Sequence, residues 1–336
     1  MSTPQPTSDG PAWDLLTFGE SMIRLTTPAG VRLESAGALD LTVGGAESNV
    51  AVALARLGRR VAWLSALPDN PLGRRIAREI AMHGVDVSPV IWVANARAGV
   101  YFMDMGSQPR PTRVLYDRAN SAIAALDSDT IDPGLVRSAR TLHLTGITPA
   151  LSAGAAEACG RLAAEAAEAG IPVALDVNYR ARLWSGNEAS EGLAPLLERV
   201  TLLLCGVDDA RAIWGLGGEP AGVARALLGR SSARVVVVTA GADGAVAVSR
   251  DEPDELVEQP AAPVQPIDAV GAGDAFAAGF LHRWLDAPAD LSGALRSGVA
   301  LAALKMTIAG DFAIVTSDEL AEAIDLLDGV AREIDR

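Results

Sequence analysis

The segment from Asp268 to Phe280, DAVGAGDAFAAGF, places an acid where a glycine-rich turn is expected to become a helix. Gly271 and Gly273 have no side chains, so a ligand can approach the main chain closely at this turn. The free N–H groups of the first helical turn would face that ligand and form an anion site. Asp274 is stabilised there by the helix dipole, but it also competes with a bound anion. A capped helix start is the alternative explanation for a lone GxGD motif.

Phosphoryl transfer is a reaction that would use both features of this turn. It requires positioning, charge neutralisation and one group that takes the proton of the acceptor hydroxyl. The amides of Gly271, Ala272 and Gly273 would hold the moving phosphoryl group. Asp274 would accept the proton from a sugar hydroxyl, since an ordinary aspartate is basic enough when the transition state is loose.

A second polar cluster lies in TVGGAESNVAVALARLG, residues 42–58, between an expected strand and an expected helix. A turn explains its two glycines, but not the polar residues 47–49 at the start of an otherwise apolar helix. A polar substrate held by the amide groups of Gly45 and Asn49 explains both, and we prefer that interpretation.

Two arginines lie on or just after expected strands. Arg180, in ALDVNYRARLW, suits a carboxylate or a phosphate because its guanidinium is planar and always charged. The alternative is an ion pair in the loop between Arg180 and Asp176. Tyr116 and Arg118 are two residues apart, so on a strand they would face the same side. For Arg118 alone, a solvated position is the alternative.

A third glycine-rich segment is VVTAGADGAVAV, in which Thr239 is followed by Gly241 and Gly244 between two expected strands. A tight hairpin would require glycines there in any case. Because GAGD follows some thirty residues later, the segment could also form a second wall of a nucleotide site.

The elements that must position these residues form an α/β pattern. From about residue 140, Val- and Leu-rich runs alternate with helical patterns, which predicts a mostly parallel sheet covered by helices on both faces. Ligands of such folds bind at the carboxyl ends of the strands, where the polar residues lie. We expect one domain over residues 13–336, preceded by a flexible tail over residues 1–12.

The first third of the chain alternates like strands without a helix between each pair. We expect lid strands within residues 19–45 and 96–122, in a small sheet over the mouth of the main one. The apolar run VYFMDM, residues 100–105, would suit a subunit contact or a pocket wall, so a homo-oligomer formed through the lid is expected.

Composition excludes several classes of protein. The net charge of −14 argues against nucleic acid or an anionic membrane as partner. Lys305 is the only lysine and lies in neither a P-loop nor a protein-kinase motif. A dehydrogenase is set aside because no GxGxxG follows the first strand. The two cysteines lack metal or redox spacing, and no signal peptide or membrane span is evident, so a cytoplasmic protein is expected.

Taken together, these motifs resemble the PfkB, or ribokinase-like, family of carbohydrate kinases over about residues 14–330. VGGAESNVAVALARLG resembles its N-terminal signature and DAVGAGDAFAAGFL its C-terminal one. The resemblance implies a ribokinase-like fold, ATP and Mg²⁺ as cofactors, and Asp274 as the catalytic base. It leaves a monovalent cation open as a further cofactor.

Within the family, VGGAESNVAVALARLG, HLTGITPALS and LDVNYRARLWS look most like the 2-keto-3-deoxygluconate kinases. Fructokinases share the DxNxRxxLW pattern, so Arg180 by itself does not select an acid sugar. The resemblance places the sugar-acid contacts on Gly45, Tyr101, Tyr116, Arg118, Ile147 and Arg180.

The nucleotide and metal residues also follow from the resemblance. The family's Asn-x-x-Glu segment is matched here by GVDD, in which Gly206 replaces Asn and Asp209 replaces Glu. Asp209 can still organise a hydrated Mg²⁺, although its reach is shorter. The expected nucleotide contacts are Thr239, Gly241, Gly244, Asp268 and Gly273.

Three functions remain open. The first is an ATP-dependent kinase of 2-keto-3-deoxygluconate or a close sugar acid. The second is a fructokinase or another neutral-sugar or nucleoside kinase of the same family. The third is a sugar- or nucleotide-binding regulator that no longer transfers phosphate, suggested by GVDD but opposed by the intact GAGD.

Overall fold

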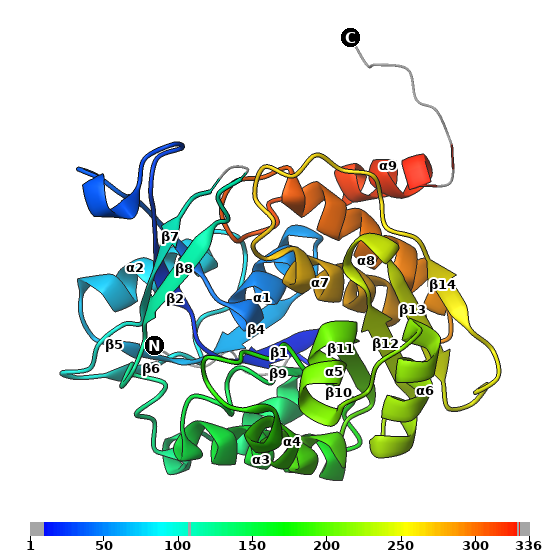
Figure 1. Ribbon diagram of the computed structural model, residues 1–336. Helices are drawn as coiled ribbons and strands as arrows, with labels where there is room; N and C mark the ends of the chain where they lie inside the picture. The colour runs from blue at the N-terminus through cyan, green and yellow to red at the C-terminus, as the bar shows by residue number, and fades with distance from the viewer. Residues whose placement is uncertain (1–9, 107–108, 328, 330–336) are drawn as a thin grey trace.

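The computed structural model describes residues 10–106, 109–327 and 329 and contains one large sheet (Figure 1). The strand order is β14-β13-β12-β11-β10-β9-β1-β4, with parallel pairing from β12 to β4 and antiparallel pairing at β13 and β14. The mostly parallel sheet expected from the apolar runs is therefore confirmed. Its strands are β1 (Leu15–Phe18), β4 (Val61–Leu64), β9 (Leu142–Thr145), β10 (Val173–Asp176), β11 (Leu202–Gly206), β12 (Val235–Thr239), β13 (Ala245–Ser249) and β14 (Val257–Gln259).

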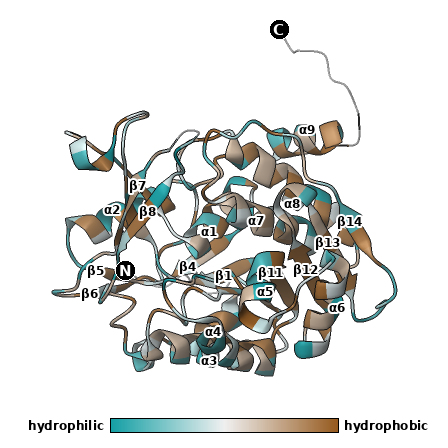
Figure 2. Ribbon diagram, in the orientation of Figure 1, coloured by the Kyte–Doolittle hydropathy of each residue, from teal (hydrophilic) through white to brown (hydrophobic). Residues whose placement is uncertain are grey.

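Helices cover both faces of this sheet. Successive strand residues alternate between two apolar cores: Leu202 and Leu204 face one core and Leu203 the other. Figure 2 shows the hydrophobic colouring of β12 and β13 between these helical layers. One layer contains α1 (Ala46–Arg56), α7 (Ala272–Trp284), α8 (Leu291–Met306) and α9 (Ser317–Leu327), and the other α3 (Ala153–Glu168), α4 (Gly186–Leu197), α5 (Val207–Trp214) and α6 (Pro220–Arg230).

A second, four-stranded sheet forms the expected lid, beside which lie α2 (Pro71–Ala81) and a short pair, β5 (Ala66–Pro68) with β6 (Ile91–Val93). Tyr101 and Met103 of the lid are buried and line a pocket beneath it. The run at residues 100–105 therefore forms part of a pocket wall. Exposed apolar side chains of the lid are Leu41 and Leu115, and the subunit contact stays a prediction. The lid order is β3 (Asp40–Gly44), β2 (Met22–Thr26), β7 (Val100–Asp104) and β8 (Arg113–Asp117).

A buried arginine joins the lid to the rest of the protein. Arg24, on β2, is only 2% exposed. Its Nη2 lies 2.7 Å from Oδ2 of Asp268, and its Nη1 lies 2.5 Å from Oδ1 of Asp311. The hydroxyl of Tyr101, on β7, donates to the other oxygen of Asp311 at 2.7 Å. Two lid strands are therefore tied to the loops that precede α7 and follow α8.

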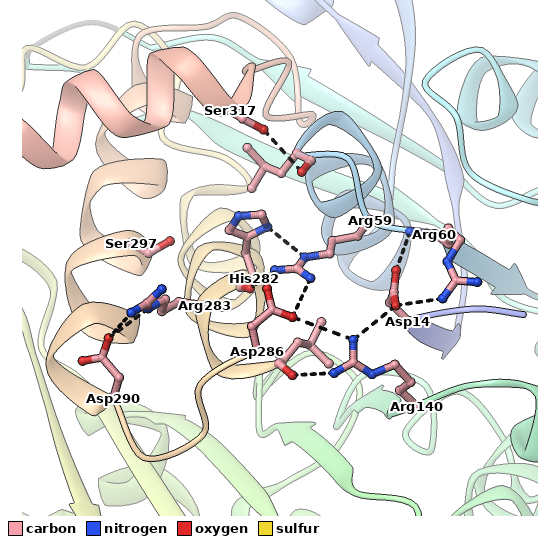
Figure 3. A network of polar contacts seen from close by, with 12 residues as sticks. Asp14, Arg59, Arg60, Arg140, His282, Arg283, Asp286, Asp290, Ser297 and Ser317 are labelled. Atoms are coloured by element: carbon pink, nitrogen blue, oxygen red, sulfur yellow. Dashed lines mark hydrogen bonds and ion pairs between the residues drawn. The ribbon is translucent and has the colours of Figure 1, made fainter. Parts of the chain in front are cut away.

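The helix that carries Asp274 is anchored at its opposite end by arginines (Figure 3). Arg59 donates to the carbonyl oxygen of His282 at 2.5 Å and forms an ion pair with Asp286 at 2.6 Å. Arg140 donates to the carbonyl oxygen of Leu285 at 2.7 Å. Guanidinium groups at a helix C-terminus satisfy its free carbonyls and interact favourably with its dipole. The position of α7 is thus fixed from both ends.

The remaining expectations concern the termini and general properties. The predicted tail, residues 1–12, falls mainly on residues 1–9, which lie outside the described part. Within the described residues, no helix has both the length and the apolar character that a membrane crossing requires. Cys159 and Cys205 are buried free cysteines.

We predict that Arg24→Met lowers the free energy of unfolding by about 3–5 kcal/mol, because it leaves two buried carboxylates without their cation. Urea denaturation at pH 7 measures this change. The control is Arg234→Met, which breaks an ion pair with Asp251 whose two side chains are each 64% exposed. That pair is expected to contribute about 1 kcal/mol or less. Equal, small losses in both variants would contradict the structural role of Arg24.

Candidate active site

Asp274 lies in the first turn of α7 with both carboxylate oxygens held by asparagine amides. Nδ2 of Asn49, on α1, donates to Oδ2 at 2.6 Å. Nδ2 of Asn178, just after β10, donates to Oδ1 at 3.2 Å. All three residues are buried. Three segments far apart in sequence thus fix the orientation of one carboxylate at the carboxyl edge of the sheet.

The electrostatics of this edge favour proton exchange. Burial raises the pKa of Asp274 above its ordinary value, while the amide of Asn49 and the charge of Arg180 counteract part of that rise. Burial, together with the charges of Asp274 and Asp209, raises the pKa of Asp176 to about 8. A raised pKa favours the neutral form of Asp176, which reduces the repulsion on an ionised Asp274.

The turn before α7 has the geometry expected of an anion site. Gly271 has a left-handed backbone with φ of 83°, and a Cβ there would lie 2.3 Å from the carbonyl oxygen of Asp311. The N–H of Ala272 donates to the carbonyl of Ala269 at 3.2 Å. In the described residues the N–H groups of Gly271 and Gly273 have no protein acceptor, and a Cβ on Gly273 would meet open space.

The residues expected to contact the sugar converge on one pocket between the lid and the sheet edge. Tyr101 and Tyr116 stand on its lid side with ring centroids 5.8 Å apart. Asp274 and Gly271 lie on its other side, so a molecule in the pocket would meet both the base and the glycine turn. The expected residues that line it are Gly45, Asn49, Tyr101, Tyr116, Arg118, Ile147 and Arg180.

Within this pocket, Asn49 has protein partners at both ends of its amide. Its Oδ1 accepts from the N–H of Gly45 at 3.2 Å, while its Nδ2 donates to Asp274. Asn49 therefore holds the carboxylate of Asp274, because its helix turn places it opposite α7. A substrate contact of Gly45 and Asn49 stays a prediction, and both residues line the pocket.

The two arginines differ in how they are held. Arg118 forms an ion pair with Glu20 at 2.5 Å, and its guanidinium lies 5.6 Å from the ring centroid of Tyr116, so these two side chains do share a side. Ser121 donates to the other oxygen of Glu20. Arg180 is exposed and donates to the carbonyl of Tyr179 at 3.1 Å. The described residues show no ion pair for Arg180, so the alternative pairing with Asp176 is not formed.

The second glycine segment forms the expected hairpin between β12 and β13. Gly241 and Gly244 have φ of 57° and 95°, and a Cβ on Gly244 would lie 2.1 Å from the carbonyl oxygen of Gln259. The hairpin alone therefore requires these glycines. Thr239 pairs with Gly206 at the ends of adjacent parallel strands, on the same sheet edge as Asp274.

The residues for a metal ion are sparse. No cluster of three or more His, Cys, Asp or Glu able to hold a metal occurs in the described residues. Asp209, in the first turn of α5, accepts from the N–H of Tyr179 at 3.2 Å. Mg²⁺ is commonly bound by one or two carboxylates together with water and substrate phosphates, and Asp209 fits that limited requirement.

Asp268, expected among the nucleotide contacts, has its carboxylate engaged with the protein. Oδ2 accepts from Arg24 and from the N–H of Gly310, and Oδ1 accepts from the N–H of Val270. Its side chain is buried and holds the loop ahead of the glycine turn.

Sequence reasoning missed several residues of the site. Asn178 stood at a strand end beside Asp176 but was not assigned to the base. A charged residue inside an alternating apolar strand, as Arg24 is in MIRLT, signals a buried ion pair but not its partner. No sequence pattern indicated the contacts that Glu20 and Asp311 make.

The sequence profile described as pfkB family carbohydrate kinase matches residues 13–315. A curated relative, the 2-dehydro-3-deoxygalactonokinase of Haloferax volcanii, is 44% identical over 311 residues, covering 93% of this chain and 96% of its own. The 2-dehydro-3-deoxygluconokinase structure of Thermotoga maritima is 30% identical with a TM-score of 0.86, over 93% of this chain and 99% of its own.

A structure from E. coli, a ribokinase II candidate in complex with ATP and Mg²⁺, has a TM-score of 0.84 over 95% of this chain and 98% of its own. At 20% identity it shares the fold alone. The ribokinase-like architecture expected from the sequence is thereby confirmed.

We predict that Asn49→Leu shifts the acidic limb of the pH profile of kcat/KM upward by about one pH unit. Asn49 donates to the ionised form of Asp274, so its loss raises the pKa of the base, and more of the base is protonated at low pH. The control is Asn187→Leu, which changes an exposed residue of α4. An acidic limb that stays in place in Asn49→Leu would contradict Asp274 as the titrating base.

Proposed function

The chain belongs to the pfkB family of carbohydrate kinases, and from that premise we propose that it transfers the γ-phosphoryl group of ATP to a hydroxyl of a 2-keto-3-deoxy sugar acid. The substrates are 2-keto-3-deoxygluconate or its galacto epimer. The similarity to the 2-dehydro-3-deoxygalactonokinase of Haloferax volcanii and the 2-dehydro-3-deoxygluconokinase of Thermotoga maritima supports this class.

The observation that carries the proposal is the position of Asp274 beside unpaired amides in the pocket that both arginines line. Asp274 accepts the proton of the sugar hydroxyl while the hydroxyl oxygen forms its bond to the γ-phosphorus. The bond between that phosphorus and the β,γ-bridging oxygen breaks, and ADP leaves with the electron pair. The N–H groups of Gly271 and Gly273 stabilise the charge on the equatorial oxygens.

The arginines provide the preference for an acid. The charges of Arg118 and Glu20 cancel in their ion pair. Arg180 adds a positive charge, so these three lining residues together are positive. A charge-assisted hydrogen bond to a sugar carboxylate would be stronger than one to a neutral hydroxyl. A neutral sugar would leave the charge of Arg180 without such a partner.

For the nucleotide, we propose the edge formed by Thr239, Gly241 and Gly244, with the phosphates directed to the turn at Gly271–Gly273. Asp209 would hold the Mg²⁺ that accompanies ATP. When bound, that ion neutralises charge on the β- and γ-phosphates. Asp268 would act by holding the loop, since its carboxylate oxygens already accept hydrogen bonds.

We predict that purified protein with Mg²⁺ consumes ATP with 2-keto-3-deoxygluconate and its galacto epimer, but at least about a hundredfold more slowly with fructose, ribose or a nucleoside. A coupled assay of ADP formation measures this, and the ratio of the two epimers assigns the substrate. Comparable turnover of fructose would contradict the acid-sugar proposal while leaving the kinase family intact.

Three variants control that assay. Asp274→Asn should reduce kcat by about 10²–10⁴-fold while sugar binding persists, which excludes a contaminating ATPase. Arg180→Leu should lower kcat/KM for the acids by about 10–100-fold, the loss of one charge-assisted contact. The matched variant Arg211→Leu removes an exposed arginine that pairs with Asp208 and should leave turnover unchanged.

A further inference from the structure

Lys305 is the only lysine among the 28 Lys and Arg residues of the chain. It lies in the last turn of α8, and its side chain is 0% exposed. No ion pair within 4.0 Å involves it in the described residues. Burial lowers the pKa of its ammonium, and the charges of Asp268 and Asp311 counteract part of that effect. The mechanism proposed above does not use it.

The ammonium of Lys305 bonds to main-chain carbonyls of two different loops. Nζ donates to the carbonyl oxygen of Asp268 at 3.0 Å and to that of Ile308 at 3.2 Å. Its Cε would lie 3.4 Å from a Cβ placed on Gly271, so the side chain runs along the glycine turn itself. The lysine therefore connects the loop before α7 to the loop after α8.

Capping of α8 explains only half of this arrangement. Lysines near a helix C-terminus often bond to carbonyls at the helix end, and the contact with Ile308, two residues past α8, is of this local kind. The carbonyl of Asp268 is 37 residues away in another segment. A fully buried ammonium also loses its hydration, a cost that a cap on the protein surface avoids.

The local charges are balanced. Arg24 and Lys305 provide two positive groups, and Asp268 and Asp311 provide two negative ones. Arg24 binds the carboxylate of Asp268 while Lys305 binds its carbonyl oxygen. The loop ahead of the glycine turn is thus held from its side chain and from its main chain.

We propose that Lys305 is a positioning residue whose ammonium serves as a built-in cation for the loops around the phosphate-binding turn. Carbonyl oxygens gathered around a positive charge resemble the coordination that K⁺ takes in proteins. A tethered ammonium supplies that charge without a bound ion, so the protein works without a monovalent cation. This inference rests on the proposed function of the Gly271–Gly273 turn.

The test compares two variants that differ in the space they leave. Lys305→Ala removes both charge and volume, so a hydrated monovalent ion can reach the carbonyls. Lys305→Met removes the charge but fills the space. The wild type and both variants are assayed in potassium, ammonium or tetramethylammonium chloride at equal ionic strength, by melting temperature and by kcat and KM for ATP.

We expect wild-type kcat to change by less than about twofold among the three salts. Both variants should lose at least about tenfold in kcat/KM for ATP. Potassium or ammonium should restore most of that loss in Lys305→Ala but not in Lys305→Met. The same ions should raise the melting temperature of Lys305→Ala alone, by about 2–4 °C over tetramethylammonium.

Three results would overturn the proposal: a wild type activated tenfold by potassium, a folded Lys305→Ala indifferent to the ion, or Lys305→Met with wild-type kinetics. If Lys305→Ala does not fold in any salt, the salt dependence of the wild type and the kinetics of Lys305→Met still test the proposal. The melting temperatures need no sugar, so a failure of the sugar-acid assignment is distinguishable from a failure of the built-in cation.

Discussion

The buried guanidinium of Arg24 holds the lid and the loops around the candidate active site in one geometry. It lies on lid strand β2 and reaches Asp268, ahead of α7, and Asp311, after α8. A charge removed from water must keep its partners, because leaving one unpaired is strongly destabilising. The lid therefore cannot separate from the sheet at this point without losing both ion pairs. The pocket wall formed by Tyr101 and the turn that begins α7 are fixed relative to each other as a result.

In the mechanism that we propose, this constraint keeps the reacting groups in fixed positions. Transition-state stabilisation by fixed dipoles depends on donors that need no rearrangement at the moment of reaction. Gly271 and Gly273 meet that condition because Arg24, Lys305 and the arginines at the far end of α7 hold their segment. Asp274 meets it because each of its carboxylate oxygens already accepts a hydrogen bond from an asparagine amide.

The sequence was sufficient to predict the layers of the fold and the edge where the site forms. Continuous Val and Leu runs identify buried parallel strands, and polar residues after those runs must meet at one edge. Pairings across long separations were not predictable from one sequence. Asn49 meets Asp274 across 225 residues, and Arg24 meets Asp311 across 287. Periodicity tells which face a residue occupies, but not which residue stands opposite, so the contact between Asn49 and Asp274 was not predicted.

The most direct test of the account is a crystal structure with a 2-keto-3-deoxy sugar acid, Mg²⁺ and a non-hydrolysable ATP analogue. We predict an acceptor hydroxyl about 2.6–3.2 Å from the Asp274 carboxylate, in line with the γ-phosphate at the glycine turn. The sugar carboxylate should contact Arg180, with the ion pairs of Arg24 unchanged. A sugar bound with its acceptor hydroxyl turned away from Asp274, or with its carboxylate far from the arginines, would contradict the account.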